Sequence, residues 1–379
     1  PVFGGITKNQ NRFNQSRRRT VKNPFPSING KKKRDGTVKQ LTVTTSSKSY
    51  RILIENNLLS WMAEPIRSVY QGNKIYIITD ERVAELYLDL VKNRLADQFS
   101  IETIVIPQGE SSKCLKQYEA VCEELLKKEI RRNELILSLG GGVVGDLAGF
   151  VAATLYRGLP YIQVPTTLLA QVDASIGGKT GMDFYHRKNI IGAFKQPELV
   201  LIDPLTIQTL PVQEFRNGMG ELIKHAFIGS PLLLEQLKKN HVVDETMIYE
   251  SLCIKKKYVE MDEWDQNERM FLNFGHTFGH MIEMEEQLKH GEAVGLGMLM
   301  ALQMGIDLQY TPVSCYETLR NIMDQYGLNT EERAYRPYLK QAVYDKKNLA
   351  GTIRFVLLKQ IGEPVFYKIK KKMLSEENQ

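Results

Sequence analysis

Three of the six histidines, His276, His280 and His290, lie within a stretch of fifteen residues. His276 and His280 are four residues apart, so on a helix they share one face. His290 opens the next segment, HGEAV, and each of the three has a glycine beside it that permits close approach. Neutral imidazoles suit a borderline cation such as Zn²⁺, and a catalytic site needs three protein ligands and an open position. Packing histidines beside an ordinary core are the alternative, but this clustering favours a metal site.

An acidic residue that can complete such a site stands earlier, in NGMGELIKHAF. Glu221 and Lys224 are three residues apart and are therefore neighbours on a helix face. A pair of this kind on a surface usually contributes little to stability. Here Gly218 and Gly220 precede it and weaken the helix without an evident structural gain, which favours a functional role. We therefore group Glu221 with His276 and His290 as a candidate metal site.

The elements that must position these groups fall into two blocks, 48–203 and 204–379. In the first, apolar or β-branched runs alternate with amphipathic stretches such as Val83–Leu95 and Leu115–Lys128, which predicts a mostly parallel α/β sheet. The runs are Tyr50–Ile54, Lys74–Thr79, Thr103–Pro107, Leu135–Leu139, Tyr161–Val164 and Leu199–Asp203. Helical periodicity in the second block predicts an all-α domain with a short strand-like ending. Its clearest helices are Met219–Phe227, Glu250–Glu260 and Gly291–Met304, and the ending comprises Ile353–Leu358 and Pro364–Ile369.

Ligands of parallel α/β sheets bind outside the carboxyl ends of the strands, and these ends carry polar residues here. Asp80 and Glu81 follow one run and can hold ribose hydroxyls. Gly140, Gly141 and Gly142 follow another run and precede VVGDLAGF, so backbone N–H groups can approach a pyrophosphate there. The spacing is not GxGxxG, and such glycines often serve tight packing alone. Two further polar residues are predicted at a sheet edge: Glu110 and Lys113.

The segment 164–194 is polar and follows neither the helical nor the strand period. A long polar loop in a compact domain is usually functional. Its apolar pieces suggest that it is packed down, with its charges in a cleft, although solvated surface lysines are the simpler alternative. The polar residues that it carries are Thr166, Thr167, Asp173, Lys179, Lys188 and Asn189.

Several cations are predicted to crowd one cleft: Lys179, Lys188, Lys224, Lys255 and Arg269. Such crowding costs energy unless an anionic ligand offsets it, and a phosphorylated carboxylate would do so. A metal would acidify a bound hydroxyl and polarise the carbonyl formed from it. The spacing alone therefore predicts a metal-assisted, nicotinamide-dependent enzyme that acts on an anionic polyol.

Composition and charge place the chain among ordinary globular proteins, with 42% hydrophobic and 25% charged residues. No apolar run reaches the roughly 18 residues that a membrane span needs. Residues 1–40 hold 11 Lys and Arg and one acid, whereas the remainder holds 39 basic and 43 acidic residues. The body therefore shows no charge signature of nucleic-acid binding. Four cysteines without a CxxC pair fit a reducing compartment, and we expect a cytoplasmic protein.

The basic N-terminal segment, assigned as residues 1–47, lacks periodicity and is predicted to be a disordered tail or leader. Because it is rich in arginine and poor in acids, an organelle transit peptide is an alternative. A cloning leader is another.

Several motifs together resemble one known family. They are GGGVVGDLAGFVAAT, RGLPYIQVPTTLLAQVDASIGGKTG, KNIIGAF, GELIK, NFGHTFGH and HGEAV. In this order, from about Tyr50 to about Tyr367, they resemble the 3-dehydroquinate synthases, which are members of the sugar-phosphate cyclase superfamily. The resemblance implies a Rossmann-like N-terminal domain, an α-helical C-terminal domain, and a homodimer with the active site between the domains.

The resemblance also implies a reaction. The family converts 3-deoxy-D-arabino-heptulosonate 7-phosphate, an anionic sugar phosphate, to 3-dehydroquinate and phosphate, with NAD⁺ used and regenerated in each turnover. A ring hydroxyl is oxidised, phosphate leaves by β-elimination, the ketone is reduced back, and an aldol step closes the ring. A divalent metal, Zn²⁺ or Co²⁺, takes part.

Residue roles carry over by motif. Glu221, His276 and His290 match the metal ligands, and His280 matches a proton-transfer residue outside the ligand set. The positions that match NAD-binding residues are Asp80, Glu81, Glu110, Lys113, Gly141, Gly142, Asp146, Thr166, Thr167, Thr209 and Leu210, with Lys179 and Lys188 at the border with the substrate. The positions that match substrate-binding or catalytic residues are Asp173, Lys179, Asn189, Lys224, Lys255, Arg269 and Asn273, together with Lys346 or Lys347. Arg157 matches an arginine that reaches the partner subunit's phosphate site.

The chain departs from the family pattern at several places, among them GELIK for the commoner AEVIK and Asn267 for a glycine. His186-Arg187 stands where a turn-forming Leu-Gly is common, and Asp265 replaces a glutamate with a proton-relay role. The alternatives are another cyclase, such as a 2-epi-5-epi-valiolone or 2-deoxy-scyllo-inosose synthase, a polyol dehydrogenase similar to glycerol dehydrogenases, and an inactive scaffold. Lys255, Arg269 and Asn273 stand as in the dehydroquinate synthases and favour that family.

Overall fold

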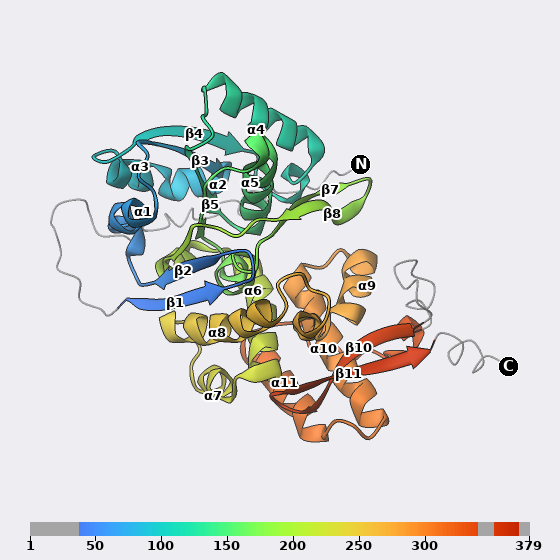
Figure 1. Cartoon of the computed structure of the whole chain (residues 1–379). Coiled ribbons are helices and arrows are strands. Elements are labelled where there is room, and N and C mark those ends of the chain that lie inside the picture. Colours follow the sequence, from blue (N-terminus) through green and yellow to red (C-terminus); the bar gives the residue numbers. More distant parts are fainter. Residues whose placement is uncertain (1–37, 340–351, 371–379) are drawn as a thin grey trace, which may run out of the picture.

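The computed structural model describes residues 38–339 and 352–370, and Figure 1 shows a sheet domain above a helical domain. The sheet has seven strands in the order β1-β2-β9-β6-β5-β3-β4, parallel throughout except for the β1–β2 pair. Its strands are β1 (Lys39–Thr44), β2 (Ser49–Ile54), β3 (Lys74–Asp80), β4 (Ser100–Ile106), β5 (Leu135–Gly140), β6 (Tyr161–Pro165) and β9 (Leu199–Ile202). The predicted α/β class of the first block is confirmed.

The central strands are apolar along their length because helices cover both faces of a parallel sheet. Every residue of β5, β6 and β9 is buried. The flanking helices are α1 (Ala63–Val69), α2 (Glu81–Val83), α3 (Asp89–Leu95), α4 (Leu115–Lys127) and α5 (Gly142–Thr154). From β3 the chain runs outward to β4, then returns to β5 and continues to β6 on the other side. The carboxyl ends of β3 and β5 therefore flank a topological switch point, where such sheets bind ligands.

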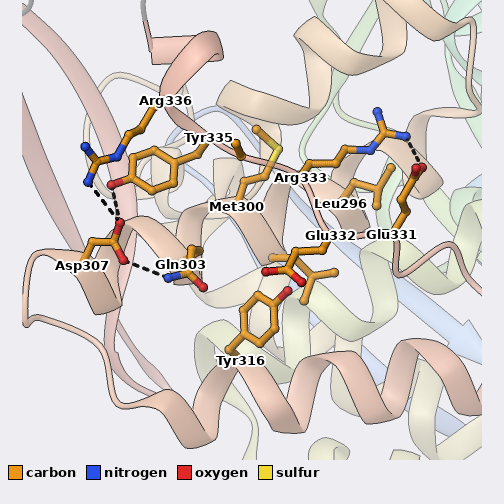
Figure 2. Close-up of a pocket in the computed structure, with 12 residues that line it drawn as sticks. Leu296, Met300, Gln303, Asp307, Tyr316, Glu331, Glu332, Arg333, Tyr335 and Arg336 are labelled. Atoms are coloured by element: carbon orange, nitrogen blue, oxygen red, sulfur yellow. Dashed lines mark hydrogen bonds and ion pairs between the residues drawn. The ribbon is translucent and has the colours of Figure 1, made fainter.

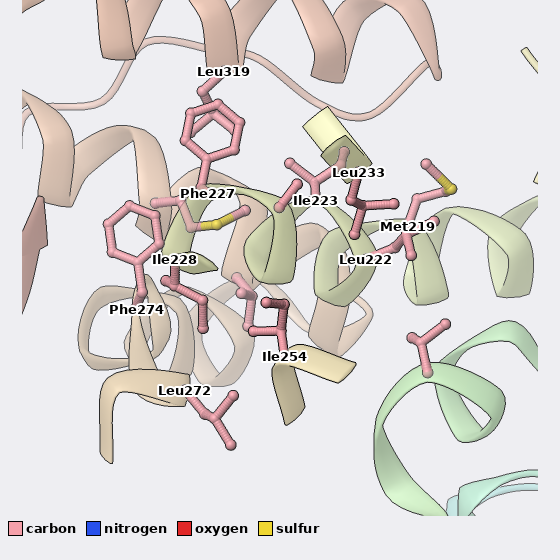
Figure 3. Close-up of a cluster of buried hydrophobic side chains, with 14 of the residues drawn as sticks. Met219, Leu222, Ile223, Phe227, Ile228, Leu233, Ile254, Leu272, Phe274 and Leu319 are labelled. Atoms are coloured by element: carbon pink, nitrogen blue, oxygen red, sulfur yellow. The ribbon is translucent and has the colours of Figure 1, made fainter. Parts of the chain in front are cut away.

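The second block is helical, as predicted, and its two predicted strand-like runs pair with each other as a β-hairpin. Its elements are α6 (Val212–Gly229), α7 (Pro231–Lys239), α8 (Glu245–Met261), α9 (His276–Glu286), α10 (His290–Asp307), α11 (Val313–Gln325), β10 (Thr352–Gln360) and β11 (Glu363–Lys370). Figure 3 shows α6 contributing Met219, Ile223 and Phe227 to a core that also receives Leu319 from α11. A helix that is buried on nearly all sides belongs to the centre of its domain. It therefore gives Glu221 and Lys224 a rigid support.

Two predictions about segments are wrong. Strand β1 lies inside the range 1–47 that we assigned to the tail, and it is an edge strand that alternates between buried and exposed residues along KQLTVT. The segment 164–194, predicted as a loop, contains a hairpin of β7 (Lys179–Phe184) and β8 (Arg187–Phe194). Gly181 and Gly192 face each other across this hairpin, where an added Cβ would lie 2.6 Å from Ile191 O and 2.4 Å from Thr180 O. Glycines at the pairing positions removed the hydrophobic alternation that marks a strand.

In the described parts of the chain, no helix combines the length and the apolar character that a membrane crossing requires.

Candidate active site

Three side chains from three helices of the second block converge. The Nε2 atoms of His276 on α9 and His290 on α10 each lie 3.4 Å from Oε1 of Glu221 on α6. Their ligand atoms all lie within 4.8 Å of one another. Glu221 is 1% exposed, and its Oε1 accepts no hydrogen bond from any described residue. A buried carboxylate oxygen without a donor, facing two imidazole nitrogens, fits a divalent cation such as Zn²⁺.

Two glycines allow the helices to come this close. A Cβ at Gly220 would lie 2.1 Å from the backbone oxygen of Gly291, and one at Gly291 would lie 1.8 Å from Asn217 O. Each glycine therefore removes a collision between α6 and α10 directly beside a candidate metal ligand. The sequence suggested that Gly220 weakens its helix without structural gain, and this interpretation is wrong, because close helix packing is the gain.

Hydrogen bonds at the outer nitrogens orient both histidines. His276 Nδ1 lies 3.3 Å from Phe274 O and His290 Nδ1 lies 3.1 Å from Glu283 Oε2, so each Nε2 faces Glu221. Burial and then Lys224 hold the pKa of His276 well below its usual value. Burial opposes the charged form of His290 as well, but the carboxylates of Glu221 and Glu283 outweigh it and raise its pKa to about 9. Such outer partners fix the tautomer and raise the basicity of a metal-bound imidazole.

The predicted group of cations is present, but each of its side chains forms an ion pair or a hydrogen bond within the protein. Lys255 Nζ lies 2.7 Å from Asp173 Oδ1, and Lys224 forms a short ion pair with Glu221. Lys179 pairs with Asp265 at 2.5 Å, and Lys188 pairs with Glu283 at 2.5 Å. Repulsion among these four lysines is therefore already offset by carboxylates, and an anionic ligand would have to exchange with them.

Arg269 completes the group of cations and is held by backbone. Its guanidinium donates to Gly177 O at 3.0 Å and to Glu263 O at 2.7 Å. Gly177 has a φ of +90°, and a Cβ there would lie 2.2 Å from Arg269 Nη2. Only glycine suits this position, since the backbone is left-handed and the guanidinium fills the space. The GGKT motif therefore positions the buried arginine.

Burial changes the acid–base properties of this region. Burial lowers the pKa of Lys255 to about 8, although the neighbouring Asp173 opposes the change. His225, beside Lys224 on α6, is fully buried, and its Nδ1 lies 2.7 Å from Ser251 Oγ. Its Nε2 points toward Asp173 Oδ1 at 3.8 Å, and burial lowers its pKa to about 3. The sequence gives no sign of a role for His225, because nothing in its local spacing distinguishes it from a core histidine.

Glu283 was also missed, although a signal was present. It lies seven residues after His276 and three after His280, so all three share one face of α9. His280 belongs to a second cluster of potential ligands, with Glu283 and His290, and not to the cluster around Glu221. Its role outside the ligand set, as the resemblance implies, stays a prediction.

The predicted nucleotide site lies where the strands of the parallel sheet end. Asp80 ends β3 and accepts from Val83 N at 2.9 Å, and Gly141 caps the N-terminus of α5 after β5. A Cβ at Gly141 would lie 2.9 Å from Thr167 Cγ2, so this position has no room for a side chain and its backbone stays accessible. Thr166, after β6, is buried, and its hydroxyl lacks a hydrogen-bond partner within the described parts of the chain. A bare helix N-terminus beside an unpaired hydroxyl fits a pyrophosphate at the switch point.

Other residues predicted to bind the nucleotide make contacts within the protein or lie at its surface. Lys113 is buried and pairs with Glu110 at 2.9 Å and Asp146 at 3.3 Å. Thr209 donates to Thr206 O at 2.9 Å and contacts the hydroxyl of Tyr87, a residue of the helical turn Ala84–Leu88, so its hydroxyl bonds within the protein. Glu81, the first residue of α2, is exposed, and Leu210 is half-buried.

Some predicted substrate residues lie at the surface. Arg157 and Asn273 are exposed, as is Asn189, whose backbone N–H donates to Asp183 Oδ1 at 2.8 Å. Lys346 and Lys347 fall outside the described residues. The roles assigned to individual residues stay predictions, and the structure supplies their geometry.

A separate cavity of about 240 Å³ lies toward the C-terminal end of α10 (Figure 2). Its polar groups bond to one another, since Asp307 accepts from Gln303 at 2.9 Å and from Tyr335 at 2.9 Å. Its lining includes none of the predicted site residues that the structure describes. The cavity is therefore not part of the candidate active site.

Solved structures share this two-domain fold. The chain resembles 2-deoxy-scyllo-inosose synthase complexed with carbaglucose-6-phosphate, NAD⁺ and Co²⁺, with a TM-score of 0.79, 21% identity, and coverage of 90% of this chain and 98% of that one. It also resembles a 2-epi-5-epi-valiolone synthase from Streptomyces hygroscopicus subsp. jinggangensis 5008 with NAD⁺ and Zn²⁺ bound, with a TM-score of 0.77, 25% identity, and coverage of 88% and 96%. The chain therefore shares its fold with these two synthases.

The family follows from sequence similarity. Residues 103–217 match the model of the 3-dehydroquinate synthase N-terminal domain, and residues 218–348 match that of the C-terminal domain. The 3-dehydroquinate synthase of Clostridium botulinum (strain Alaska E43 / Type E3) is 40% identical over 338 residues, which are 86% of this chain and 97% of the relative. That of Clostridium perfringens (strain SM101 / Type A) is 42% identical over 342 residues, 87% and 98% respectively. The chain belongs to the 3-dehydroquinate synthase family.

Proposed function

We propose that this protein converts 3-deoxy-D-arabino-heptulosonate 7-phosphate to 3-dehydroquinate and inorganic phosphate, a step of the shikimate pathway to aromatic amino acids. The relatives named 3-dehydroquinate synthase support this activity, because the chain covers nearly all of their length. The reaction eliminates phosphate, so the enzyme is a lyase. Its substrate is an anionic sugar phosphate, and its cofactors are NAD⁺ and a divalent metal.

The observation that carries the proposal is the arrangement around Glu221. An unpaired buried carboxylate oxygen faces two oriented imidazoles, and Lys224 lies beside it. Glu221, His276 and His290 would hold Zn²⁺ or Co²⁺, and the backbone at Gly141 and Gly142 would hold the NAD⁺ pyrophosphate. When bound, the metal acidifies the substrate hydroxyl, and NAD⁺ takes up and later returns the hydride of the same carbon.

The protein's own residues bind and orient the substrate. The buried cations of Lys255 and Arg269 would hold its carboxylate, with Lys255 exchanging Asp173 for the ligand. Elimination breaks the carbon–oxygen bond to phosphate after a proton leaves the neighbouring carbon. His280 would hold a proton at this stage, and Lys179 and Asn189 on the hairpin would bind the oxygens of the sugar. Burial of Lys224 and Lys255 strengthens these contacts, because water screens them less.

We further propose a cytoplasmic homodimer in which Arg157 reaches the active site of the second copy. Its exposure on this chain leaves it available for such a contact. Sedimentation of the purified protein, with Arg157→Ala assayed beside the unsubstituted protein, tests both parts.

The activity is tested by phosphate release from 3-deoxy-D-arabino-heptulosonate 7-phosphate with catalytic NAD⁺ and Zn²⁺ or Co²⁺, while NADH absorbance is followed. The proposal expects phosphate without accumulating NADH, and loss of phosphate release in EDTA. Steady NADH production without phosphate would instead identify a polyol dehydrogenase.

A second candidate is another sugar-phosphate cyclase, because two of the solved structures with this fold are such enzymes. The same assay with sedoheptulose 7-phosphate and glucose 6-phosphate distinguishes the candidates. Phosphate release from either of these, and none from the heptulosonate, would favour the second candidate.

A further inference from the structure

Glu283 on α9 connects the metal cluster, which is the candidate metal site of Glu221, His276 and His290, to the β7–β8 hairpin of the other domain. Its Oε2 lies 3.1 Å from Nδ1 of His290, and its Oε1 accepts from Nζ of Lys188 at 2.5 Å. Lys188 belongs to β8, whereas Glu283 and His290 belong to the helical domain. One carboxylate therefore joins three elements, and each of its oxygens has a different partner.

The geometry of α9 explains why a residue at position 283 can reach the metal cluster. Glu283 is two turns from His276 along α9, so both side chains point to the same side of the helix. The Glu283 side chain is only 10% exposed, so its two contacts are shielded from water. A carboxylate that accepts from the outer nitrogen of a metal-binding histidine fixes the ring and makes it a stronger ligand.

The other contact is easier to break. The Lys188 side chain is 60% exposed, and a lysine with this much solvent contact exchanges partners readily. An anionic ligand that draws Lys188 away would leave Glu283 bonded to His290 alone. The contact between Lys188 and Glu283 thus holds the hairpin against the metal cluster without locking it.

We propose that Glu283 is a positioning residue that orients His290 for the metal and holds the β7–β8 hairpin through Lys188. The inference rests on the metal site described under the proposed function. Glutamine has nearly the shape of glutamate but carries no charge and has one acceptor oxygen instead of two. Glu283→Gln therefore removes the double contact without creating a cavity.

The first measurement is Co²⁺ affinity by competition with a chelator, with the visible spectrum of bound Co²⁺ recorded without substrate. Glu283→Gln is expected to weaken Co²⁺ binding roughly 10- to 100-fold and to change the spectrum. Glu285→Gln makes the same charge change on the exposed side of α9 and is expected to leave both unchanged. Equal Co²⁺ affinity in Glu283→Gln and the unsubstituted protein would overturn the inference. Failure of the unsubstituted protein to bind Co²⁺ would instead remove the metal site itself, so the two failures are distinguishable.

The second measurement is hydrogen exchange of the hairpin amides in the Co²⁺-loaded protein. Faster exchange is expected in both Glu283→Gln and Lys188→Met, and combining them should add little, because both remove one contact. Lys188→Met keeps the contact between Glu283 and His290, so its Co²⁺ affinity should stay within about threefold of the unsubstituted protein. Unchanged exchange in both variants would overturn the connection to the hairpin.

Discussion

Glu221, His276 and His290 are carried by three packed helices, whereas Lys179, Lys188 and Asn189 are carried by a two-stranded hairpin. The cluster of Glu221, His276 and His290 is centred on a carboxylate that is 1% exposed, and close contacts at glycines hold its helices together. The hairpin residues are exposed and are held by single ion pairs or backbone bonds. The cluster of three helices is therefore rigid before a ligand binds. The hairpin residues can exchange their partners for the ligand when it binds.

The turn of the hairpin strengthens this contrast. Tyr185 and His186 both have positive φ, +49° and +58°. Left-handed backbone is unfavourable for residues with a Cβ, so the turn is strained at these two residues. None of Glu221, His276 and His290 has a positive φ. Strained backbone therefore occurs in this exposed turn and not at the three candidate ligands.

The largest expected effect comes from removing a metal ligand. His276→Ala should weaken Zn²⁺ or Co²⁺ binding by at least about 100-fold and phosphate release by about 1,000-fold, because the metal contributes several kcal/mol to the reaction. Metal content after dialysis and the phosphate assay measure the two effects. His241→Ala, at an exposed position away from the cluster, is the control and should change neither. Full metal binding in His276→Ala would show that the cluster is not the metal site.

The next effect tests the rigidity of the cluster. Gly291→Ala places a methyl group 1.8 Å from Asn217 O, where backbone must shift. We expect a loss of about 2–3 kcal/mol in the free energy of unfolding, together with weaker metal binding. At Gly295, one turn later on α10, the closest atom to an added Cβ is the flexible terminal methyl of Met323, 2.8 Å away, so Gly295→Ala should cost less than about 1 kcal/mol. Urea unfolding of the metal-free proteins measures both, and equal losses would argue against close helix contact as the source of rigidity.

The pH dependence of kcat/KM tests the role of the buried cation Lys255. The pKa of Lys255 is lowered to about 8, so this lysine loses its charge as the pH rises through that value. If its positive charge binds the substrate carboxylate, kcat/KM should fall about tenfold per pH unit above about pH 8. Lys255→Arg keeps the positive charge at high pH and should remove this decline, whether or not it lowers the maximal kcat/KM. A decline that persists unchanged in Lys255→Arg would assign it to another group.

The smallest effect concerns the strained turn. His186→Gly relieves a positive φ and should raise the free energy of unfolding by about 1 kcal/mol. Arg187→Gly, within β8, should lower it by about 0.5–1 kcal/mol, because a strand residue gains only backbone freedom in the unfolded chain. Denaturant titration distinguishes the two signs. No gain in stability from His186→Gly would indicate that the turn carries no strain.

Patterns along the chain predicted the class of fold and a metal site. Strand runs alternating with helices predicted the parallel sheet, which is confirmed, and the clustering of His276, His280 and His290 predicted the metal site, which stays a prediction. These features are local, since periodicity and motif order follow from neighbouring residues. The hairpin of β7 and β8 was missed, because its glycines hide the alternation of a strand.

Only the tertiary structure decided which charges meet. The sequence shows five cations and many acids, but the pairing of Lys179 with Asp265 and of Lys188 with Glu283 joins segments from different domains. The same holds for Gly220, which looked like a weak point in a helix until Gly291 was placed against it. Such contacts depend on how helices and sheet pack, and no local period encodes which residues packing brings within hydrogen-bond distance.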